Sequence, residues 1–365
     1  MTSRAETAPH AEGGRAQIIG TGLIGGSVGM ALRSVGWHVT GSDQLDDVAA
    51  AALGAGAIDE IGIDPDAGLI VICTPSSQVA EVANALLAAS SDPRLMVTDV
   101  AGVKAPIVRA VDDPRFIGGH PMAGSEQLGV EGARSDLFLG ATWVLTPGPD
   151  TPAETYGRLL SVVRSLGAQG VALSAADHDR LVAHVSHVPH LVASALMNEA
   201  ASVAESDAAL LLLAAGGFRD MTRIAAGDPA IWPDVCVENS DAILESLDAL
   251  GTQLAHLRHA IATEDRSAIG TALSSASTAR RSLPGRSVDP DQLAEVRIPV
   301  PDRAGVLAEV TATASELGLS VVDVDIAHSI EGGRGVLIVV VAHSEAQRYA
   351  TALRVRGFIC SVVDR

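Results

Sequence analysis

Short apolar runs alternate with longer helix-like stretches over the first half of the chain. The runs that we expect to form strands are residues 16–19, 38–42, 69–72, 95–98, 116–119, 141–145 and 170–173. Repeated strand–helix units specify a parallel sheet with helices on both faces. The pattern therefore predicts an α/β fold, a doubly wound parallel sheet of the Rossmann type, over residues 15–174.

The pattern changes twice after this region. Between residues 175 and 283 no strand pattern appears, and Ala-, Leu- and Val-rich stretches predict an all-helical domain. Residues 284–292 are a turn-rich linker. The rest, residues 293–365, reads as strand, helix, strand, strand, helix, strand, which is the small ferredoxin-like βαββαβ unit. We expect residues 1–14 to be a disordered tail because they lack an apolar core.

The composition narrows the classes of protein to consider. A net charge of −19 argues against nucleic acid or an anionic membrane as the main partner. Three widely spaced cysteines without a Cys-x-x-Cys pair argue against a disulfide framework or a thiolate metal site. No apolar stretch reaches the ~18 residues of a membrane-spanning helix. The cysteine pattern fits a reducing compartment, so we expect a cytoplasmic protein, and residues 1–14 lack the apolar core of a secretory signal.

A glycine-rich turn follows the first predicted strand and opens a helix. Its residues are Gly20, Thr21, Gly22, Leu23, Ile24 and Gly25. In this context the glycines allow a tight turn, the approach of a pyrophosphate and close packing of the helix on the sheet. The free N–H groups of the helix N-terminus then face phosphate oxygens. The motif predicts a dinucleotide site.

An acidic residue follows the second predicted strand. Asp43 lies 18 residues after Gly25, near the spacing expected for a carboxylate that accepts from the ribose hydroxyls. Because this carboxylate repels a 2′-phosphate, we predict NAD rather than NADP. The alternative is a solvated aspartate in a turn. Thr74, Pro75 and Asp99 come at the ends of the next two strands, near the nicotinamide half of the cofactor.

His120 follows the strand at 116–119, within a glycine-rich stretch. The carboxyl end of such a strand faces the ligand crevice of an open α/β sheet. An imidazole with a usual pKa of about 6.5 can accept a proton near neutral pH, so His120 is a candidate general base. Pro121 is expected to end the strand, because proline has no N–H to donate. The alternative for His120 is a structural histidine in a turn.

The helical region carries two polar clusters. His184, His187 and His190 are spaced so that they share a helical face. Structural histidines, a metal site and contacts to a substrate or nicotinamide all stay open, but we expect no metal because no carboxylate or cysteine has a matching spacing. Arg219 and Arg223 are four residues apart and suit the capture of a carboxylate. Their alternative is a surface salt-bridge face with Asp220 or Asp228.

These motifs together resemble the prephenate/arogenate dehydrogenases of tyrosine biosynthesis. The resemblance rests on Gly-x-Gly-x-x-Gly, G-G-H-P-M-A-G-S-E, V-S-H-V-P-H, G-G-F-R-D-M-T-R-I-A and D-P-x-x-W in this order. It implies NAD-dependent oxidative decarboxylation of prephenate, or of arogenate, and we expect a homodimer that forms through the helical domain and the C-terminal domain. It implies a catalytic set of His120, Arg223, His190 and Ser125. It also implies a substrate pocket bordered by Glu126, Ser186, His187 and Arg219.

One position departs from the family pattern. In many members a serine precedes a Val-Lys pair and hydrogen-bonds the catalytic histidine, whereas this chain has Gly102 there. We therefore expect that Ser125 or a water molecule orients His120, or that the hydrogen bonding of the site differs.

Residues 301–307, Pro-Asp-Arg-Ala-Gly-Val-Leu, resemble the first loop of ACT domains, which bind amino acids at dimer interfaces. The resemblance implies an effector site at Asp302, Arg303, Gly305 and Val306, with tyrosine as the expected effector and feedback control as its purpose. The alternative is a domain that only dimerises.

Two further classes of function stay as rivals. β-Hydroxyacid dehydrogenases share the plan of a cofactor domain and a helical domain, but they generally use a lysine of the helical domain, and this region has none. A non-catalytic ligand sensor with a degenerate dinucleotide fold is the other. The intact glycine motif, His120 and Arg223 argue against it.

Overall fold

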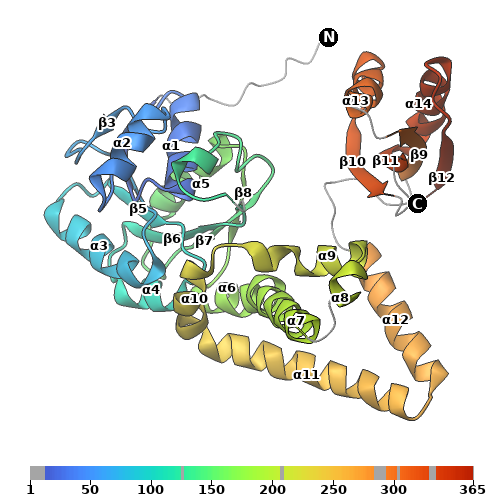
Figure 1. Cartoon of the computed structure of the whole chain (residues 1–365). Helices are drawn as coiled ribbons and strands as arrows, with labels where there is room; N and C mark the ends of the chain where they lie inside the picture. Colours follow the sequence, from blue (N-terminus) through green and yellow to red (C-terminus); the bar gives the residue numbers. More distant parts are fainter. Residues whose placement is uncertain are drawn as a thin grey trace, which may run out of the picture. The chain divides into compact units, whose positions relative to one another are not determined.

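The computed structural model describes residues 13–124, 127–205, 209–282, 293–301, 305–328 and 334–364. The chain divides into two compact units, Met1–Gln253 and Leu254–Arg365, which are described separately (Figure 1). Most of the predicted tail and all of the predicted linker lie outside the described residues. In the described part, no helix is both long enough and apolar enough to cross a membrane.

The first unit is built on an eight-stranded sheet of order β3-β2-β1-β4-β5-β6-β7-β8. The strands are β1 Arg15–Ile19, β2 His38–Ser42, β3 Glu60–Ile61, β4 Leu69–Ile72, β5 Met96–Asp99, β6 Phe116–Pro121, β7 Thr142–Thr146 and β8 Gln169–Ala172. From β3 to β6 all neighbours are parallel, as the repeated units predicted. The prediction did not include β3.

The parallel prediction is wrong for the last two strands. β7 pairs antiparallel to β6, and β8 runs parallel to β7. Within its described residues, the connection between β6 and β7 contains the short 3₁₀ helix η1, Val130–Gly132, and no crossover α-helix, which is why β7 can pair antiparallel with β6. β6 also continues through His120 to Pro121, its last residue, which is two residues beyond the expected end. After Pro121, the Met122 N–H donates to the Thr142 carbonyl oxygen.

Helices cover both faces of this sheet (Figure 1). They are α1 Leu23–Ser34, α2 Asp46–Gly54, α3 Ser76–Ala89, α4 Ala105–Ala110 and α5 Ala153–Ser165. All four residues of β4 are buried, which is why this strand reads as a continuous apolar run. Val71 packs with α1 and α5, whereas Ile70 and Ile72 pack with α3 and α4 on the other face.

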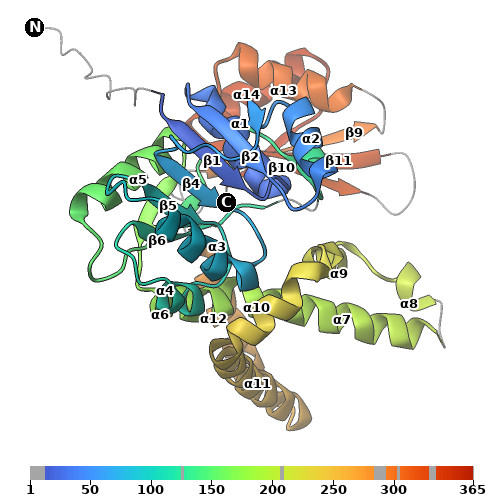
Figure 2. The same ribbon diagram turned by 90° about the vertical axis from the view of Figure 1, so that its left-hand side faces the viewer.

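The helical region follows β8 directly. Its elements are α6 Ala175–Val182, the π-helical turn η2 Ala183–His187, α7 Val188–Ala204, α8 Ala209–Leu212, α9 Gly216–Thr222, η3 Arg223–Ala226, η4 Pro229–Ile231, α10 Trp232–Glu238 and α11 Ser240–Ala262. Ala183, Val188 and Ile243 form its buried core. α10 lies beside the start of α3 (Figure 2), where Ser77 donates to Asp234 at 2.9 Å, so the helical region is joined to the sheet region.

The second unit contains the end of α11, then α12 Arg266–Arg281, and an α/β sheet. The elements of this part are β9 Leu293–Pro301, α13 Val306–Glu316, β10 Val321–His328, β11 Arg334–Ala342, α14 His343–Val355 and β12 Ser361–Asp364. The strand order is β10-β11-β9-β12 with all neighbours antiparallel. Alternate residues of β9 and β11 pack with both helices in one core, which gives the predicted βαββαβ order.

Candidate active site

The carboxyl ends of the parallel strands meet at one edge of the sheet. Ile19 at the end of β1 pairs with Ile72 at the end of β4, and Ile72 pairs with Asp99 at the end of β5. β6 continues the same direction beside β5 and carries His120. The strand order reverses between β1 and β4, so this edge is the position where open α/β sheets bind dinucleotides.

The glycine loop fits a pyrophosphate. Gly20 has a φ of +89°, which a residue with a side chain rarely adopts, and a Cβ on Gly25 would lie 1.9 Å from the Gly20 carbonyl oxygen. A Cβ on Gly22 would meet nothing within 4 Å in the described structure, so the space above this residue is open. Gly22 is the N-cap of α1, and no described side chain caps the helix. Its N-terminus can therefore receive phosphate oxygens.

Asp43 is held in place beside this loop. Its Oδ2 accepts from the Thr21 N–H at 2.8 Å, and its Oδ1 accepts from the Leu45 N–H at 3.1 Å. A carboxylate has about four lone-pair positions, so these bonds orient Asp43 and leave capacity for ribose hydroxyls. Thr74 and Pro75 follow β4, and Pro75 is the N-cap of α3.

His120 contacts His178 of the helical region, which in turn contacts Asp179. Nδ1 of His120 lies 2.8 Å from Nε2 of His178, and Nδ1 of His178 lies 2.7 Å from Oδ1 of Asp179. The two rings meet edge to face. On the opposite side of the His120 ring, a Cβ on Gly102 would lie 3.8 Å from Nε2. The ring is therefore held through Nδ1, and Nε2 faces the space that a serine at position 102 would occupy.

The sequence analysis did not identify His178 or Asp179. It expected Ser125 or a water molecule, and not these two residues, to orient His120. Ser174 is the N-cap of α6 and accepts from the Asp177 N–H, which sets the first turn of the helix. That capping pattern, followed by adjacent histidine and aspartate, was the available signal. Which strand they meet depends on tertiary packing, and the sequence does not show it.

The electrostatic environment keeps His120 neutral. Burial lowers its pKa well below the usual 6.5, and the neighbouring basic groups of His178, Lys104 and His187 further disfavour a positive charge on the ring. A neutral imidazole at pH 7 has one nitrogen that can accept a proton, so the ring can act as a general base.

Asp99 and Lys104 form a fully buried ion pair beneath the site. The Asp99 carboxylate also accepts from the N–H groups of Gly119 and Ala101, each at 3.0 Å. Asp99 was predicted to bind the cofactor, but its side chain is 0% exposed and engaged within the protein. Any effect on the cofactor is therefore indirect, through the strand end that carries His120. Burial lowers the pKa of Lys104, and Asp99 opposes that shift.

His187 and His190 lie on either side of Trp232. The His190 ring stacks on the indole with centroids 3.7 Å apart, and the His187 ring meets it edge-on at 6.1 Å. Nδ1 of the buried His187 accepts from the Asn239 side chain at 3.2 Å. Burial lowers the pKa of both histidines, that of His187 to about 4. Ser186, which directly precedes His187 in the sequence, is half-buried in the π-helical turn.

Arg219 and Arg223 do not belong to one α-helix, contrary to what the prediction assumed. α9 ends at Thr222, and Arg223 begins the 3₁₀ helix η3, so the two arginines are not on one continuous α-helical face. Arg219 donates to the carbonyl of Ala214 at 3.1 Å, and Asp228 caps η4 through the Ala230 N–H. η3 packs against α7, the helix that carries His190, so the segment of Arg223 borders this cluster.

Several predicted residues lie elsewhere or outside the described residues. Ser125, Glu126, Asp302 and Arg303 lie outside them. Gly305 has a φ of +90° and starts α13, a conformation that favours glycine. Val306 was predicted to bind an effector, but its side chain belongs to the core of the second unit and is 5% exposed. Only its backbone at the helix start could face a ligand.

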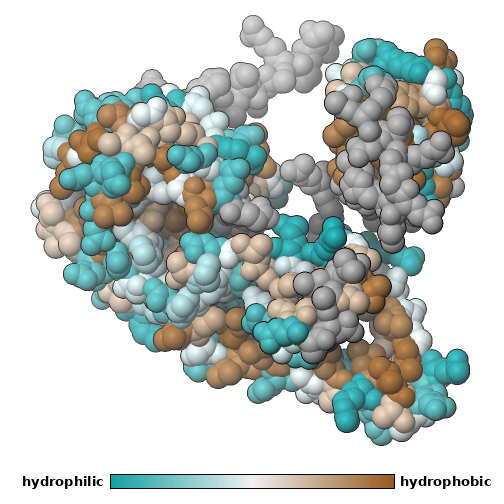
Figure 3. Space-filling view, viewed as in Figure 1, coloured by the Kyte–Doolittle hydropathy of each residue, from teal (hydrophilic) through white to brown (hydrophobic). Residues whose placement is uncertain are grey.

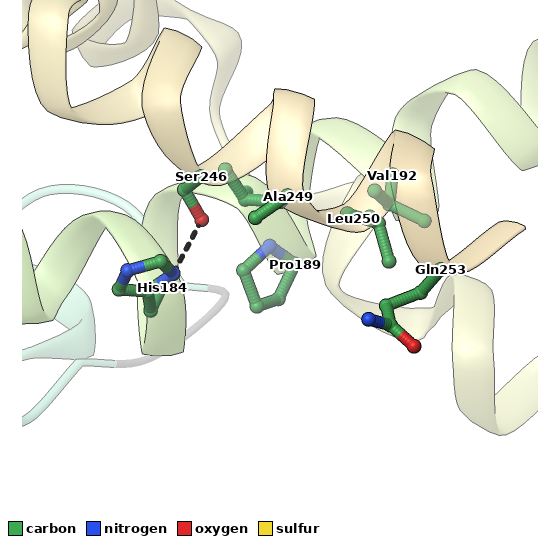
Figure 4. A pocket seen from close by; sticks show the side chains of 8 residues that line it. His184, Pro189, Val192, Ser246, Ala249, Leu250 and Gln253 are labelled. Carbon is green, nitrogen blue, oxygen red and sulfur yellow. Dashed lines mark hydrogen bonds between the residues drawn. The ribbon is translucent and has the colours of Figure 1, made fainter. Parts of the chain in front are cut away.

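A groove of about 400 Å³ is lined by His184 but not by His187 or His190. In Figure 4 it runs between the α7 side, with His184, Pro189 and Val192, and α11, with Ser246, Ala249, Leu250 and Gln253. Nδ1 of His184 forms a hydrogen bond of 2.7 Å with the Ser246 hydroxyl oxygen. The predicted common face of the three histidines is therefore wrong, because the π-helical turn changes their spacing. Among the described residues, no group of three His, Cys, Asp or Glu side chains is arranged to hold a metal.

Comparison with known proteins gives matches along most of the chain. A family model described as the nucleotide-binding domain of prephenate dehydrogenase matches residues 28–172, and one described as its dimerization domain matches residues 174–274. A prephenate dehydrogenase of Bacillus subtilis (strain 168) is 32% identical over 333 residues, which cover 88% of this chain and 90% of that protein.

Two solved structures are also similar. Prephenate dehydrogenase from A. aeolicus, in complex with hydroxyphenyl propionate and NAD⁺, is 28% identical with a TM-score of 0.70 and covers 75% of this chain and 99% of its own. Arogenate dehydrogenase from Synechocystis is 32% identical with a TM-score of 0.63 and covers 73% of this chain and 98% of its own.

Proposed function

Because this chain belongs to the prephenate dehydrogenase family and is an NAD-dependent oxidoreductase, we propose that its substrate is prephenate. The reaction would give 4-hydroxyphenylpyruvate, CO₂ and NADH in tyrosine biosynthesis. The observation that carries the proposal is the neutral His120 at the cofactor edge of the sheet, with Nε2 directed away from its protein partner.

His120 is the general base of the proposed reaction. Nε2 takes the proton of the ring 4-hydroxyl as the C4–H bond gives up its hydride, and the bound NAD⁺ supplies the hydride acceptor. The C1–carboxylate bond then breaks, and its electron pair completes the aromatic ring of the product. A positioned base contributes about 10²–10⁴-fold to such a step. The glycine loop and Asp43 hold the cofactor in this proposal.

The substrate carries two carboxylates, which we assign to the second polar cluster. Arg223 would bind one of them, since a guanidinium suits bidentate carboxylate recognition. His190, fixed by its stack on Trp232, would border the same pocket with Ser186 and His187, and Arg219 would lie at its mouth. Ser125 and Glu126 complete the proposed pocket from the sequence resemblance.

Arogenate is the alternative substrate, with an amino group in place of the side-chain keto group. The Synechocystis relative is an arogenate dehydrogenase at 32% identity, so this candidate has support of its own. The assay is NADH formation at 340 nm with prephenate and arogenate, each with NAD⁺ and NADP⁺. Turnover of prephenate with NAD⁺ supports the proposal, and turnover of arogenate alone replaces the substrate but keeps the role of His120. Turnover of neither contradicts the proposed function.

We also propose a homodimer that forms through the helical region. The matching family model is described as a dimerization domain. Val185, Val237 and Leu244 of this region are large hydrophobic residues with more than half of their surface exposed, and hydrophobic surface lies along α11 (Figure 3). Light scattering coupled to size exclusion should give twice the chain mass, and a monomer at micromolar concentration would refute the proposal. All three cysteines are free, which fits a cytoplasmic enzyme.

For the C-terminal sheet we propose an ACT-like regulatory role with tyrosine as the effector. Its support is the βαββαβ order and the left-handed Gly305 at the start of α13. Tyrosine should inhibit the full chain and leave a chain without residues 291–365 unaffected. Inhibition that persists in the shortened chain would place tyrosine at the active site instead.

A further inference from the structure

We propose that His178 and Asp179 are positioning residues that fix the tautomer of His120, with its proton on Nδ1 and Nε2 left as the base. This inference rests on the proposed function for its catalytic consequence, but the tautomer itself is a property of the protein without substrate. It assigns the orientation of His120 to a pair of residues on α6 that lie on the Nδ1 side of the ring, whereas the position where the family pattern has a serine, Gly102, lies near Nε2.

The direction of the hydrogen bonds follows from Asp179. Its Oδ1 accepts from the Lys104 N–H and its Oδ2 from the Ala105 N–H, each at 2.7 Å. A carboxylate that already accepts two backbone bonds is an ionised acceptor, so Nδ1 of His178 donates to it. With the single ring proton of His178 on Nδ1, its Nε2 has only a lone pair to offer. At 2.8 Å, it must accept the Nδ1–H of His120.

The pair is rigid enough to set this arrangement. His178 is 0% exposed and Asp179 is 5% exposed, so water does not compete for their bonds. Asn239 donates to the Asp179 carbonyl at 2.9 Å and fixes the backbone of the same residue. The two backbone donors belong to the start of α4, at the same edge of the sheet as His120. The pair thus joins the helical region to the strand that carries the base.

The same bonds stabilise His120 after it accepts a proton. The Nδ1–H of the imidazolium remains on His178, and the carboxylate of Asp179 lies behind that ring. No further proton transfer is required, because orientation and charge stabilisation account for the effect of such a carboxylate. Nε2 faces Gly102, which adds no side chain there, so the substrate hydroxyl can approach it.

The test uses the full chain and three substitutions. His178→Leu removes the acceptor, His178→Gln keeps an acceptor oxygen, and Asp179→Asn offers an N–H to His178 and so favours the opposite tautomer. Asp177→Asn is the control, since Asp177 is on the same helix but exposed and bonded to Ser174 and Arg180. The readouts are kcat and KM for prephenate, and the ¹⁵N shifts of the His120 ring in the protein without substrate, assigned with a His120→Asn variant.

We expect wild-type His120 to be protonated on Nδ1 and not on Nε2. His178→Leu should lower kcat about 100-fold or more, and Asp179→Asn up to about 10⁴-fold, with KM changed less than about threefold. His178→Gln should regain at least about tenfold of the loss, and the control should stay within about twofold. A merely structural role would not move the ¹⁵N shifts.

A wild-type ring protonated on Nε2 would overturn the proposal, and so would a His178→Leu variant with near-normal kcat. If the wild type oxidises neither prephenate nor arogenate, the proposed function fails, and the ¹⁵N shifts of the wild type still decide the tautomer. If a variant does not fold, the wild-type spectrum gives the same decision.

Discussion

Lys104→Met tests how strongly the buried ion pair stabilises the site. The substitution keeps an unbranched side chain of similar length but removes the cation. Asp99, 0% exposed, then keeps only the N–H groups of Gly119 and Ala101 as partners for its charge. Breaking a buried pair by removing one partner costs about 3–5 kcal/mol. That is a large part of the ~5–15 kcal/mol that a folded domain commonly has.

Removing both charges should be less harmful than removing one. In the double variant Asp99→Asn with Lys104→Met, no uncompensated charge remains, and one backbone hydrogen bond worth about 1 kcal/mol is lost. We therefore expect the double variant to be more stable than Lys104→Met by about 2 kcal/mol or more. Arg180→Met is the control, because its pair with Asp177 is about half exposed and should contribute less than about 1 kcal/mol.

Urea unfolding, followed by tryptophan fluorescence, measures these differences in the free energy of unfolding for the first unit, which contains Lys104. All three tryptophans, Trp37, Trp143 and Trp232, belong to the first unit. A Lys104→Met variant within about 1 kcal/mol of wild type, or a double variant no more stable than the single one, would refute the reasoning. As a second readout, loss of the Lys104 charge should raise the pKa of His120. Because the neutral ring is the active form, the acidic limb of kcat/KM should move to higher pH.

Three further predictions follow from single contacts. Gly22→Ala should fold, since a Cβ there meets nothing within 4 Å, but should weaken NAD⁺ binding by calorimetry about tenfold or more; unchanged affinity would move the pyrophosphate elsewhere. Gly102→Ser should leave the fold intact and kcat within about threefold of wild type, because a Cβ at this position would come no closer than 3.8 Å to His120. A large loss of kcat would show that the pocket is tighter than this distance indicates. His187 has a pKa near 4 in the folded state against about 6.5 unfolded, so the unfolded chain binds more protons below pH 6.5 and stability falls as pH drops towards 4, by about 3 kcal/mol. In His187→Gln that part of the pH dependence, measured by urea unfolding at pH 7.5 and 4.5, should be absent, and an unchanged slope would contradict it.

The sequence predicted the elements whose signals are local. The strand at 69–72 is a pure apolar run, and the glycine turn at Gly20 needs a φ that few other residues adopt, so both were readable without a structure. The reversal of β7 was not readable in the same way. An antiparallel return and a parallel crossover can have similar apolar strands, and the difference lies in a connection without a periodic helix.

The candidate site was predictable only in part for a related reason. His120 follows a strand, so its place at the carboxyl edge follows from topology. His178 contacts it across 58 residues of sequence and is itself bonded to Asp179, and Asp99 turns inward to a lysine instead of outward to a cofactor. The common face predicted for His184, His187 and His190 assumed a regular α-helix. The π-helical turn that contains His184 and His187 has a different number of residues per turn, so the assumption does not hold. Such contacts depend on how two regions pack, which spacing along one element does not show.

The burial of Lys104 also decides how this protein reacts with amine-directed reagents. It is the only lysine among the 365 residues, and the other residues counted as Lys or Arg are all arginines. With its amine 0% exposed and paired, acylating reagents should modify the folded protein only at its α-amino group. A second label then appears only when the region around β5 and α4 opens. The rate of that single acylation therefore reports local opening beneath the active site, without any background from other side chains.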